Sequence, residues 1–185
     1  MCSSDLNSLS FGSMSTPLPS IDSELAAWIA AQKMFFVASA PLSGDGHVNL
    51  SPKGGEAFKV LGPLEVAYHD YTGSGAETAA HLRENGRIVV MFCSFEGPPK
   101  IVRLHGRGEV IGPNDPRFAA LQALFPANPG TRSFVRIVVE RVSKSCGYSV
   151  PLYEFRGQRD TLEEWACAKG PEELKAYWEI GRAHV

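Results

Sequence analysis

Residues 67–92, AYHDYTGSGAETAAHLRENGRIVVMF, constrain the fold most, because they join two strand-like runs through a very short helical pattern. Valine, isoleucine and aromatic residues predict one strand before Thr72 and another after Gly86. The helical pattern between them covers at most ten residues, 76–85, which is the lower limit for a crossover between parallel strands. No further strand–helix units of this kind follow in the chain. We therefore expect an antiparallel sheet.

The rest of the chain alternates extended runs with short turns, and its helical patterns lie at the chain ends and at two crossings. Extended runs are predicted at residues 34–41, 47–55, 57–71 (interrupted at Gly62 and Pro63), 99–113, 133–145 and 148–155. Helices are predicted at residues 21–32 (with Ser20 as the cap), 115–125, 160–170 and 171–178. This order predicts an α+β fold, with six or seven antiparallel strands closed into a small barrel and helices packed outside it.

The glycine turn before residues 76–85 allows two interpretations. A dinucleotide-binding turn is excluded, because Thr78 stands where that motif needs a third glycine. The hydroxyls of Thr72, Ser74 and Thr78, with the backbone amides around Gly75, could instead bind a phosphate at the start of the helix. The alternative is a helix cap by Ser74, which is the more frequent role for such a residue.

Two further groups of cations are candidates for anion binding. The segment NLSPKGG, residues 49–55, exposes Lys53 beside flexible backbone, although solvated hairpin ends often have this composition. Arg103, His105 and Arg107 share one face of a predicted strand. They could face an anionic ligand or line the outside of the barrel.

Both ends of the chain are expected to be foreign to the natural protein. The last seven residues, EIGRAHV, can be written in codons whose reverse complement encodes MCSSDL, the first six residues, when GTG is read as the initiator. Two ends of one natural gene would not encode each other's complement by chance. We therefore interpret residues 1–6 and 179–185 as adapter-derived, residues 7–13 as a leader of uncertain origin, and residues 14–178 as one domain.

The composition excludes several classes of partner and site. The formal net charge of −2 gives no general attraction to nucleic acid or to an anionic membrane. No apolar run reaches the roughly 18 residues of a membrane helix, and no signal peptide precedes Ser20. Cys93, Cys146 and Cys167 form no C-x-x-C pair, which favours reduced thiols and a cytoplasmic protein. The histidine and cysteine spacings predict no metal site, and no Ser/His/Asp set for hydrolysis is evident.

Several motifs taken together resemble a known family. In chain order they are MFFVASAP, GHVNLSPKG, LEVAYHDYTGSGAETAAHLRENGRIVVMF, RLHGRGEV and SCGYSVP. Their order and combination resemble the pyridoxamine 5'-phosphate oxidase-like family of FMN-binding split barrels, in particular a bacterial subgroup. The resemblance covers residues 20–178, nearly the whole predicted domain.

This resemblance implies a six-stranded antiparallel split β-barrel that forms a homodimer and binds FMN in grooves at the dimer interface. By position, residues 49–53 match the strand along the isoalloxazine, and residues 68–74 match the strand end and loop that hold the ribityl phosphate. The cofactor-binding residues that this match implies are Asn49, Leu50, Ser51, Lys53, Tyr68, Asp70, Tyr71, Thr72, Ser74, Gly75 and Thr78.

The chain departs from the oxidase proper at the phosphate-binding turn. Residues 74–76, Ser-Gly-Ala, stand where the oxidase has Ser-Arg-Lys. Lys53, backbone amides and an arginine such as Arg87 or Arg107 would have to compensate. No counterpart of the oxidase's C-terminal Trp and Arg-rich motif occurs in residues 148–178, so oxidation of pyridoxamine phosphate itself is not expected.

The resemblance therefore implies an FMN-dependent oxidoreductase that acts on an unknown small molecule by hydride or electron transfer through flavin N5. No catalytic residue is assigned. Two alternatives remain. One is the deazaflavin F420 on the same barrel, whose polyanionic tail would need a longer cationic groove. The other is a non-catalytic flavin- or haem-binding module.

Overall fold

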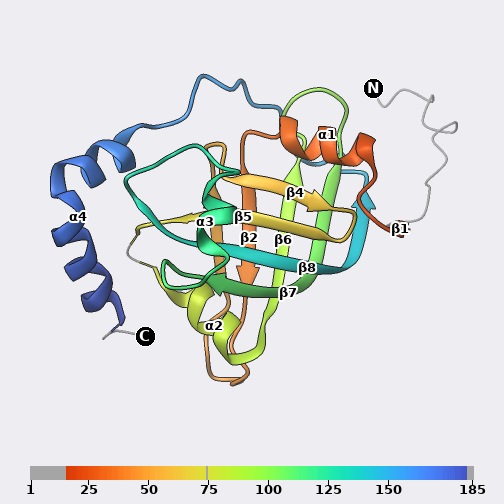
Figure 1. Ribbon diagram of the computed structural model, residues 1–185. Coiled ribbons are helices and arrows are strands. Elements are labelled where there is room, and N and C mark those ends of the chain that lie inside the picture. Colours follow the sequence, from red (N-terminus) through yellow and green to blue (C-terminus); the bar gives the residue numbers. More distant parts are fainter. Residues whose placement is uncertain (1–15, 74, 183–185) are drawn as a thin grey trace, which may run out of the picture.

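The structure is a computed structural model that describes residues 16–73 and 75–182 (Figure 1). Ser74 and predicted adapter residues 1–6 and 183–185 lie outside the described residues. The elements in chain order are β1 (Thr16–Leu18), α1 (Ser23–Ala31), β2 (Phe35–Ser39), β3 (Asn49–Lys53), β4 (Phe58–Gly62), β5 (Glu65–Tyr71), α2 (Glu77–Asn85), β6 (Arg87–Cys93), β7 (Ile101–Ile111), α3 (Phe118–Gln122), β8 (Thr131–Ser145) and α4 (Thr161–Arg182).

The strands form one antiparallel sheet, flanked by helices, and the predicted α+β class is confirmed. The strand order is β3–β2–β6–β7–β8–β5–β4, and β1 pairs with the far end of β8. The described sheet has eight strands rather than six or seven, because β1 is added to it; β4 and β5 are separate strands on either side of the break at Gly62 and Pro63, as predicted. No pairing joins the end strands β3 and β4 in the described chain, so hydrogen bonds do not close the barrel.

The sheet bends in the middle of its two longest strands. The pairing of β7 with β8 has a bulge between His105 and Gly106. A Cβ atom on Gly106 would lie 2.1 Å from the carbonyl oxygen of Val138, so only glycine permits this close approach. Because of this bend, β2 and β6 cross behind β5 and β8, and the sheet encloses a core (Figure 1).

Two hydrophobic clusters lie on opposite faces of the bent sheet. The larger one fills its inside and includes the fully buried Val37 and Leu104. The smaller one lies under α3 and includes Phe125 and Phe134. Consecutive residues of β5 alternate between the two clusters, as the period of a strand requires.

The helix boundaries follow local chemistry. α1 begins after Asp22, whose Oδ1 accepts a hydrogen bond from the Leu25 amide at 2.8 Å, so the predicted cap at Ser20 was wrong. α4 is two helical segments that meet at Gly170 (φ 72°) before Pro171, which confirms the predicted boundary. None of the described helices combines the length and apolar character that a membrane-spanning helix requires.

The predicted strand at residues 148–155 is not a strand. The Tyr153 amide donates to the Phe95 carbonyl at 2.9 Å, and the Phe155 amide donates to the Glu96 carboxylate at 3.1 Å. Pro151 has no amide hydrogen, and these isolated bonds do not make a ladder. We call residues 151–160, which run without regular structure from the chain after β8 to α4, the strap (Figure 1).

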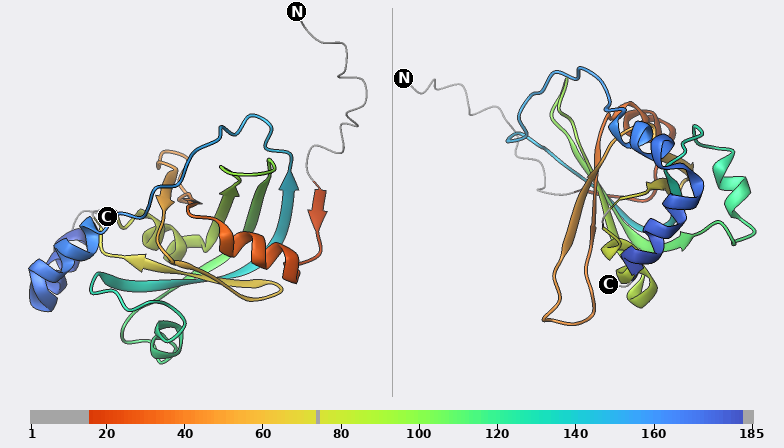
Figure 2. Two further views of the ribbon diagram at one scale, coloured as in Figure 1. Left: turned by 90° about the horizontal axis from the view of Figure 1, so that it is seen from above. Right: turned by 90° about the vertical axis from the view of Figure 1, so that its left-hand side faces the viewer.

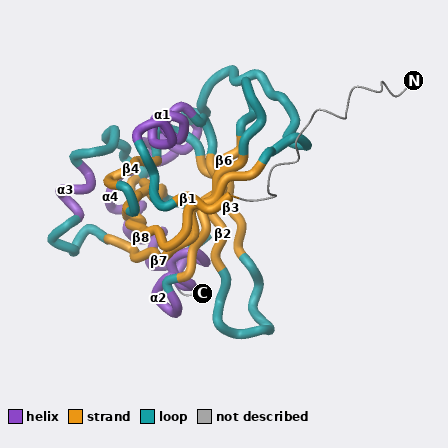
Figure 3. Tube along the Cα trace, turned by 90° about the vertical axis from the view of Figure 1, so that its right-hand side faces the viewer, coloured by secondary structure: helices purple, strands orange, loops and turns teal. Residues whose placement is uncertain are grey.

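The hairpin of β2 and β3 projects from the body of the molecule (Figures 2 and 3). Its loop is largely exposed, and the Leu50 side chain on β3 is 62% exposed. In the described sheet β3 pairs only with β2. One edge of its backbone is therefore available to a ligand or another chain.

Candidate functional site

A small cavity brings together the two sequence motifs of residues 49–55 and 72–78. It has a volume of about 40 Å³ and lies between the end of β3 and the start of α2, and we call it the β3–α2 hollow. It is lined by Ser51, Lys53, Asp70, Gly75, Ala76, Glu77, Thr78, Ala79, Arg132 and Val135. Five of the predicted site residues are therefore in one place: Ser51, Lys53, Asp70, Gly75 and Thr78.

Asp70 is the buried centre of the charges in this hollow. It is 6% exposed, and its carboxylate lies 3.5 Å from Lys53 Nζ and 2.9 Å from Arg132 Nη2. The Ser133 hydroxyl donates a hydrogen bond to it at 3.0 Å. Because the Asp70 carboxylate only accepts hydrogen bonds, its role is to hold these side chains, and it cannot bind a phosphate directly.

The lining of the β3–α2 hollow is balanced in formal charge. Lys53 and Arg132 face the carboxylates of Asp70 and Glu77. Asp70 is buried and held by three side chains, whereas Glu77 is exposed in the first turn of α2. An exposed side chain can rotate away from an incoming anion, so Glu77 is the group that an anion would displace.

Arg132, which the sequence analysis did not single out, connects the hollow to the glycine turn. Its guanidinium donates to the Gly73 carbonyl at 3.5 Å and to the Gly75 carbonyl at 3.2 Å. Its Nε also donates to Asp70 at 3.0 Å. These bonds hold the turn that leads into α2. No local signal marks Arg132, because only the pairing of β5 with β8 brings it beside Asp70.

α2 begins without a side-chain cap. Its N-cap is Ala76, and no side chain of the described residues accepts a cap hydrogen bond there. Ser74, predicted as a cap or an anion ligand, lies outside the described residues. First-turn amides that have no side-chain acceptor among the described residues, together with the helix dipole, favour a bound anion, so the start of α2 can contribute to an anion site.

Three predicted residues connect β3 to α2 through their side chains. Asn49 Nδ2 donates to Thr78 Oγ1 at 2.7 Å, and Ser51 Oγ donates to Asn49 Oδ1 at 3.2 Å. The burial pattern of β3 directs Asn49, Ser51 and Lys53 to one face, and Leu50 to the other. The network therefore fixes the edge strand against the helix that begins at the hollow.

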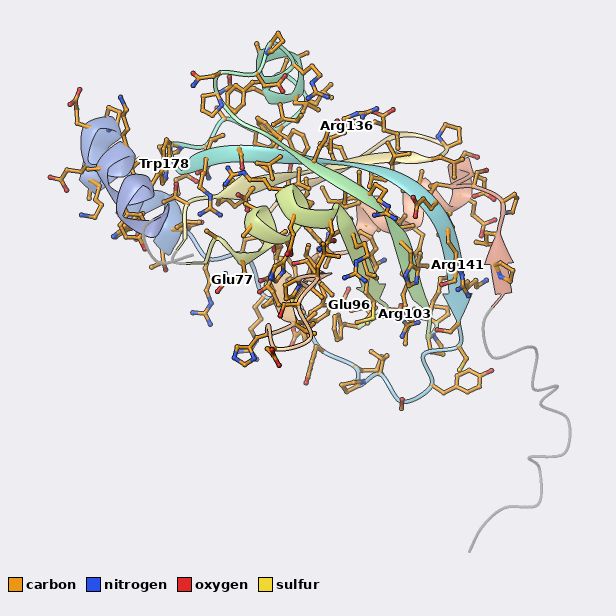
Figure 4. All side chains as sticks on the ribbon, turned by 90° about the horizontal axis from the view of Figure 1, so that it is seen from below. Glu77, Glu96, Arg103, Arg136, Arg141 and Trp178 are labelled. Carbon is orange, nitrogen blue, oxygen red and sulfur yellow. The ribbon has the colours of Figure 1, made fainter. Side chains whose placement is uncertain are left out.

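Thr72 is occupied by structural hydrogen bonds. It is 1% exposed, its hydroxyl donates to the Gly130 carbonyl at 2.9 Å, and it accepts from Trp178 Nε1 at 2.8 Å. Figure 4 shows Trp178 between α4 and the sheet. Thr72 therefore anchors α4 and the chain around Gly130 beside the glycine turn, and its proton is already used.

Two predicted aromatic residues lie outside the hollow. The Tyr68 ring is fully buried in the larger core cluster, and Lys53 Nζ is 5.3 Å from its centroid. Burial, with the nearby Asp70, raises the pKa of Tyr68 well above its ordinary value, and its hydroxyl has no hydrogen-bond partner within the described chain. Tyr71 instead lines a second, larger cavity.

The arginines that were expected to compensate at the phosphate lie elsewhere. Arg87 donates to the Pro41 carbonyl at 3.1 Å, and Arg107 donates to the Asn85 carbonyl at 2.7 Å. Neither lines the β3–α2 hollow. Arg87 or Arg107 was predicted to supply a positive charge at the phosphate site. Within one copy of the chain, Arg132 is the arginine that lines the hollow.

Two of the described histidines have side-chain partners. His69 Nε2 lies 2.8 Å from Thr131 Oγ1, and His81 Nδ1 lies 3.0 Å from Ser39 Oγ. Across residues 16–73 and 75–182 no group of three or more His, Cys, Asp or Glu side chains is arranged to hold a metal ion. The hollow itself is lined by the cations of Lys53 and Arg132, the hydroxyls of Ser51 and Thr78, and the carboxylates of Asp70 and Glu77.

The family model described as "Pyridoxamine 5'-phosphate oxidase" matches residues 21–146 of the chain. A curated relative, the pyridoxamine 5'-phosphate oxidase family protein ustO of Aspergillus flavus, is 45% identical over 152 residues. The match covers 80% of this chain and 61% of the relative, so the chain spans about three fifths of that protein's length.

Solved structures support the same fold. The HupZ protein of Group A Streptococcus superimposes with a TM-score of 0.51 at 21% identity, over 66% of this chain and 91% of that one. A putative pyridoxamine 5'-phosphate oxidase from Lactobacillus delbrueckii gives a TM-score of 0.52 at 17% identity, over 68% of this chain and 97% of that one. At these identities the likeness concerns the fold alone.

Proposed function

The chain belongs to the pyridoxamine 5'-phosphate oxidase family, and on this basis we propose that it is a flavin-dependent oxidoreductase that binds FMN and acts on a small molecule. The observation that carries the proposal is the β3–α2 hollow, where Lys53, Arg132 and the start of α2, which no described side chain caps, meet beside an edge strand. When bound, FMN supplies hydride or electron transfer through its N5 atom. The residues of this chain bind and orient it.

The phosphate of FMN suits the β3–α2 hollow. A cavity of about 40 Å³ admits one phosphate group and excludes a flavin ring. Lys53 offers a point charge, and the first-turn amides of α2 offer hydrogen-bond donors directed outward from the helix. Arg132 contributes charge while it holds the turn through the Gly73 and Gly75 carbonyls.

The isoalloxazine ring has a suitable support in β3. Apart from Pro52, which has no N–H, the free backbone edge of this strand presents N–H and C=O groups, and the pyrimidine part of a flavin has complementary acceptors and donors. Asn49 and Ser51 point to the same face as Lys53, so ring and phosphate can be bound along one strand. This is the role that the family resemblance implies for residues 49–53.

The charge balance favours FMN over F420. Two cations and two carboxylates line the hollow, so no excess of positive charge is present for a polyanionic tail. A single phosphate needs only two things. Glu77 must be displaced, and the first-turn amides of α2 must donate hydrogen bonds to the phosphate. A non-catalytic flavin- or haem-binding module is the remaining alternative.

A homodimer is part of the proposal, because an outer face of the sheet offers a surface for a second copy. The strand registers place two rows of side chains across β3, β2, β6 and β7 on this face. These rows are Leu50, Ala38, Val89, His105 and Pro52, Phe36, Met91, Arg103. A second copy on this face would cover Leu50 and the other apolar members of the rows.

The test of cofactor binding uses two substitutions with opposite expected effects. Lys53→Ala removes a cation from the hollow and should lower FMN affinity at least about tenfold, whereas Glu77→Gln removes the competing carboxylate and should raise it. Both are measured by titration of the purified chain with FMN, and the mass of any cofactor released from fresh protein identifies it. Reduction of the bound flavin by NADH or NADPH separates an enzyme from a non-catalytic module.

Lys59→Ala is the matched control, because Lys59 lies on β4 and does not line the hollow. Its FMN affinity should equal that of the parent protein. A colourless protein that takes up no FMN would refute the proposal. If Lys53→Ala and Lys59→Ala bound FMN with equal affinity, Lys53 would not contribute to binding the phosphate.

A further inference from the structure

A second cavity, about 1030 Å³ in volume, lies between the rim of the barrel and the strap. The barrel side is formed by the chain after α1 and by residues 54–56, which follow β3. The other side is formed by the strap and the first turn of α4, including Glu163. We call it the strap cavity. Its size is that of a site for a whole small molecule.

The strap is attached to the barrel at both sides of this cavity. Besides the bonds from Tyr153 and Phe155 to residues 95 and 96, Gln158 Nε2 donates to the Lys33 carbonyl at 3.0 Å. The strap therefore spans two separate parts of the barrel rim. Because hydrogen bonds fix its position, the cavity beneath it is a built feature of the fold.

Aromatic rings form the apolar walls of the strap cavity. Phe95 and Tyr153 are stacked with their centroids 5.5 Å apart, and Trp28 and Phe155 also line the space. Tyr153 is 62% exposed and Phe155 is 42% exposed. A molecule bound in the cavity would cover part of both rings. Exposed rings gathered in one concave place indicate a binding surface for a flat apolar group.

Carboxylates outnumber cations in the lining. The acidic residues are Glu56, Glu96, Glu154, Asp160 and Glu163, and the basic residues are Lys33 and Arg159. The Lys33 ammonium lies against the Phe155 ring, 5.6 Å from its centroid. A lining with this excess of negative charge disfavours phosphorylated or carboxylate ligands and favours a cation.

Glu56 and Glu163 are two lining carboxylates that could receive that cation. They come from opposite sides of the cavity, and each acts electrostatically on the Tyr71 hydroxyl that lies between barrel and strap. Burial first, then Glu163 and Glu56, raises the pKa of Tyr71. In the part of the chain that the structure describes, neither carboxylate is in an ion pair.

We propose that the strap cavity is a binding site for a flat organic cation without a phosphate group, such as an arylalkylamine. Its ammonium group lies between Glu56 and Glu163, and its ring lies against Tyr153 and Phe155. The site adjoins the β3–α2 hollow through neighbours in the chain, since Gly54 follows Lys53 and Tyr71 follows Asp70. Binding of the cation needs no flavin.

The test compares two probes that share a ring and a chain but carry opposite charges, 4-phenylbutylamine and 4-phenylbutyrate. Each is titrated into the full chain by isothermal calorimetry, with and without added FMN. We expect the amine to bind at least about tenfold more tightly than the carboxylate, in both conditions. Equal affinities, a preference for the carboxylate, or no binding of either probe would overturn the proposal. Because the FMN-free measurement stands alone, its result does not depend on the flavin.

Substitutions then locate the amine. The double variant Glu56→Gln with Glu163→Gln should weaken binding of the amine at least about tenfold, while Glu172→Gln, in α4 but outside the lining, should leave it unchanged. Tyr153→Ala, in the exposed strap, should weaken both probes, because it removes ring contact without changing charge. Amine binding by the double variant equal to that of the parent would overturn the assignment, provided that its circular dichroism shows a folded chain.

Discussion

Asp70 and His69 are consecutive residues of β5 with opposite surroundings. Asp70 faces the hollow and accepts from Lys53, Arg132 and Ser133, whereas His69 faces the cluster under α3 and stacks on Phe134 with centroids 4.7 Å apart. Because consecutive residues of a strand point to opposite faces of the sheet, the charged site and the apolar core lie on the two sides of β5. A register slip of β5 would bury the carboxylate among aromatic rings.

The protonation state of His69 follows from its neighbour. The Thr131 hydroxyl donates to the Asn128 carbonyl at 2.5 Å, so its oxygen can only accept from His69 Nε2 at 2.8 Å. His69 Nδ1 is buried and has no partner in the described chain. The neutral ring, with its proton on Nε2, fits this environment. Burial lowers the pKa of His69 from 6.5 to about 4, although Asp70 acts in the opposite direction.

This shift predicts a pH dependence of stability. Because the pKa of His69 is depressed on folding, the unfolded chain binds the proton more readily between pH 6.5 and about 4. The free energy of unfolding should fall as pH falls through this window, by at most about 1.4 kcal/mol per pH unit for one proton. His69→Gln keeps a donor for Thr131 without a titrating group, so its stability should depend less on pH. Urea unfolding at pH 7 and pH 5 measures this.

The control for this measurement is His47→Gln, in the exposed loop between β2 and β3. It should keep the pH dependence of the parent protein. If His69→Gln also kept the parental dependence, protonation of His69 would have no part in the acid sensitivity.

At the scale of elements, the bulge of β7 decides the shape of the sheet. Gly106→Ala would place a methyl group against the Val138 carbonyl, a backbone atom that cannot move alone. We expect the free energy of unfolding to fall by about 3 kcal/mol, at the upper end for overpacking, because the paired strands must separate there. Urea denaturation measures the change. Gly112→Ala is the matched control, since a Cβ there would meet nothing within 4 Å; similar losses in both variants would contradict this account.

Local patterns in the sequence predicted most elements but not those that depend on distant contacts. The pattern of residues 76–85 became α2 within one residue, because apolar periodicity and the terminal Gly86 act locally. Residues 148–155 have the composition of a strand, but in the structure they make only isolated hydrogen bonds to residues 95 and 96. Their segment became the strap instead.

The candidate site shows the same limit. Lys53 was identified from a turn motif, which is a local signal, and Ser51 from the family resemblance; the structure brings both together with Thr78. Arg132 was missed because the pairing of β5 with β8 determines its position, 62 residues along the chain from Asp70. Thr72 was predicted as an anion ligand, but the structure places its hydroxyl between Gly130 and Trp178.

At the scale of the whole molecule, the outer face of β3, β2, β6 and β7 leads to a prediction about assembly. Met91 lies in one of its rows, between Phe36 and Arg103. Arg103 is labelled in Figure 4. Met91→Glu places a charge in the middle of the proposed dimer interface and should convert a dimer to a folded monomer. Light scattering after size exclusion gives the mass, and circular dichroism checks the fold.

Leu124→Glu is the control for assembly, because Leu124 is exposed beside α3 and outside these rows. It should stay dimeric. A parent protein that is monomeric with FMN bound would contradict the proposed arrangement, as would dimers of unchanged stability in Met91→Glu.

The hydrogen bond from Trp178 to Thr72 has a consequence for how the protein can be observed. It holds an indole fluorophore beside the turn that leads to the β3–α2 hollow. A flavin absorbs where indole emits, so cofactor bound nearby would quench Trp178 by energy transfer. Trp28 and Trp165 also emit, so in a variant with both replaced by phenylalanine the emission of Trp178 would report occupancy in real time. The end of α4 would then act as an optical sensor.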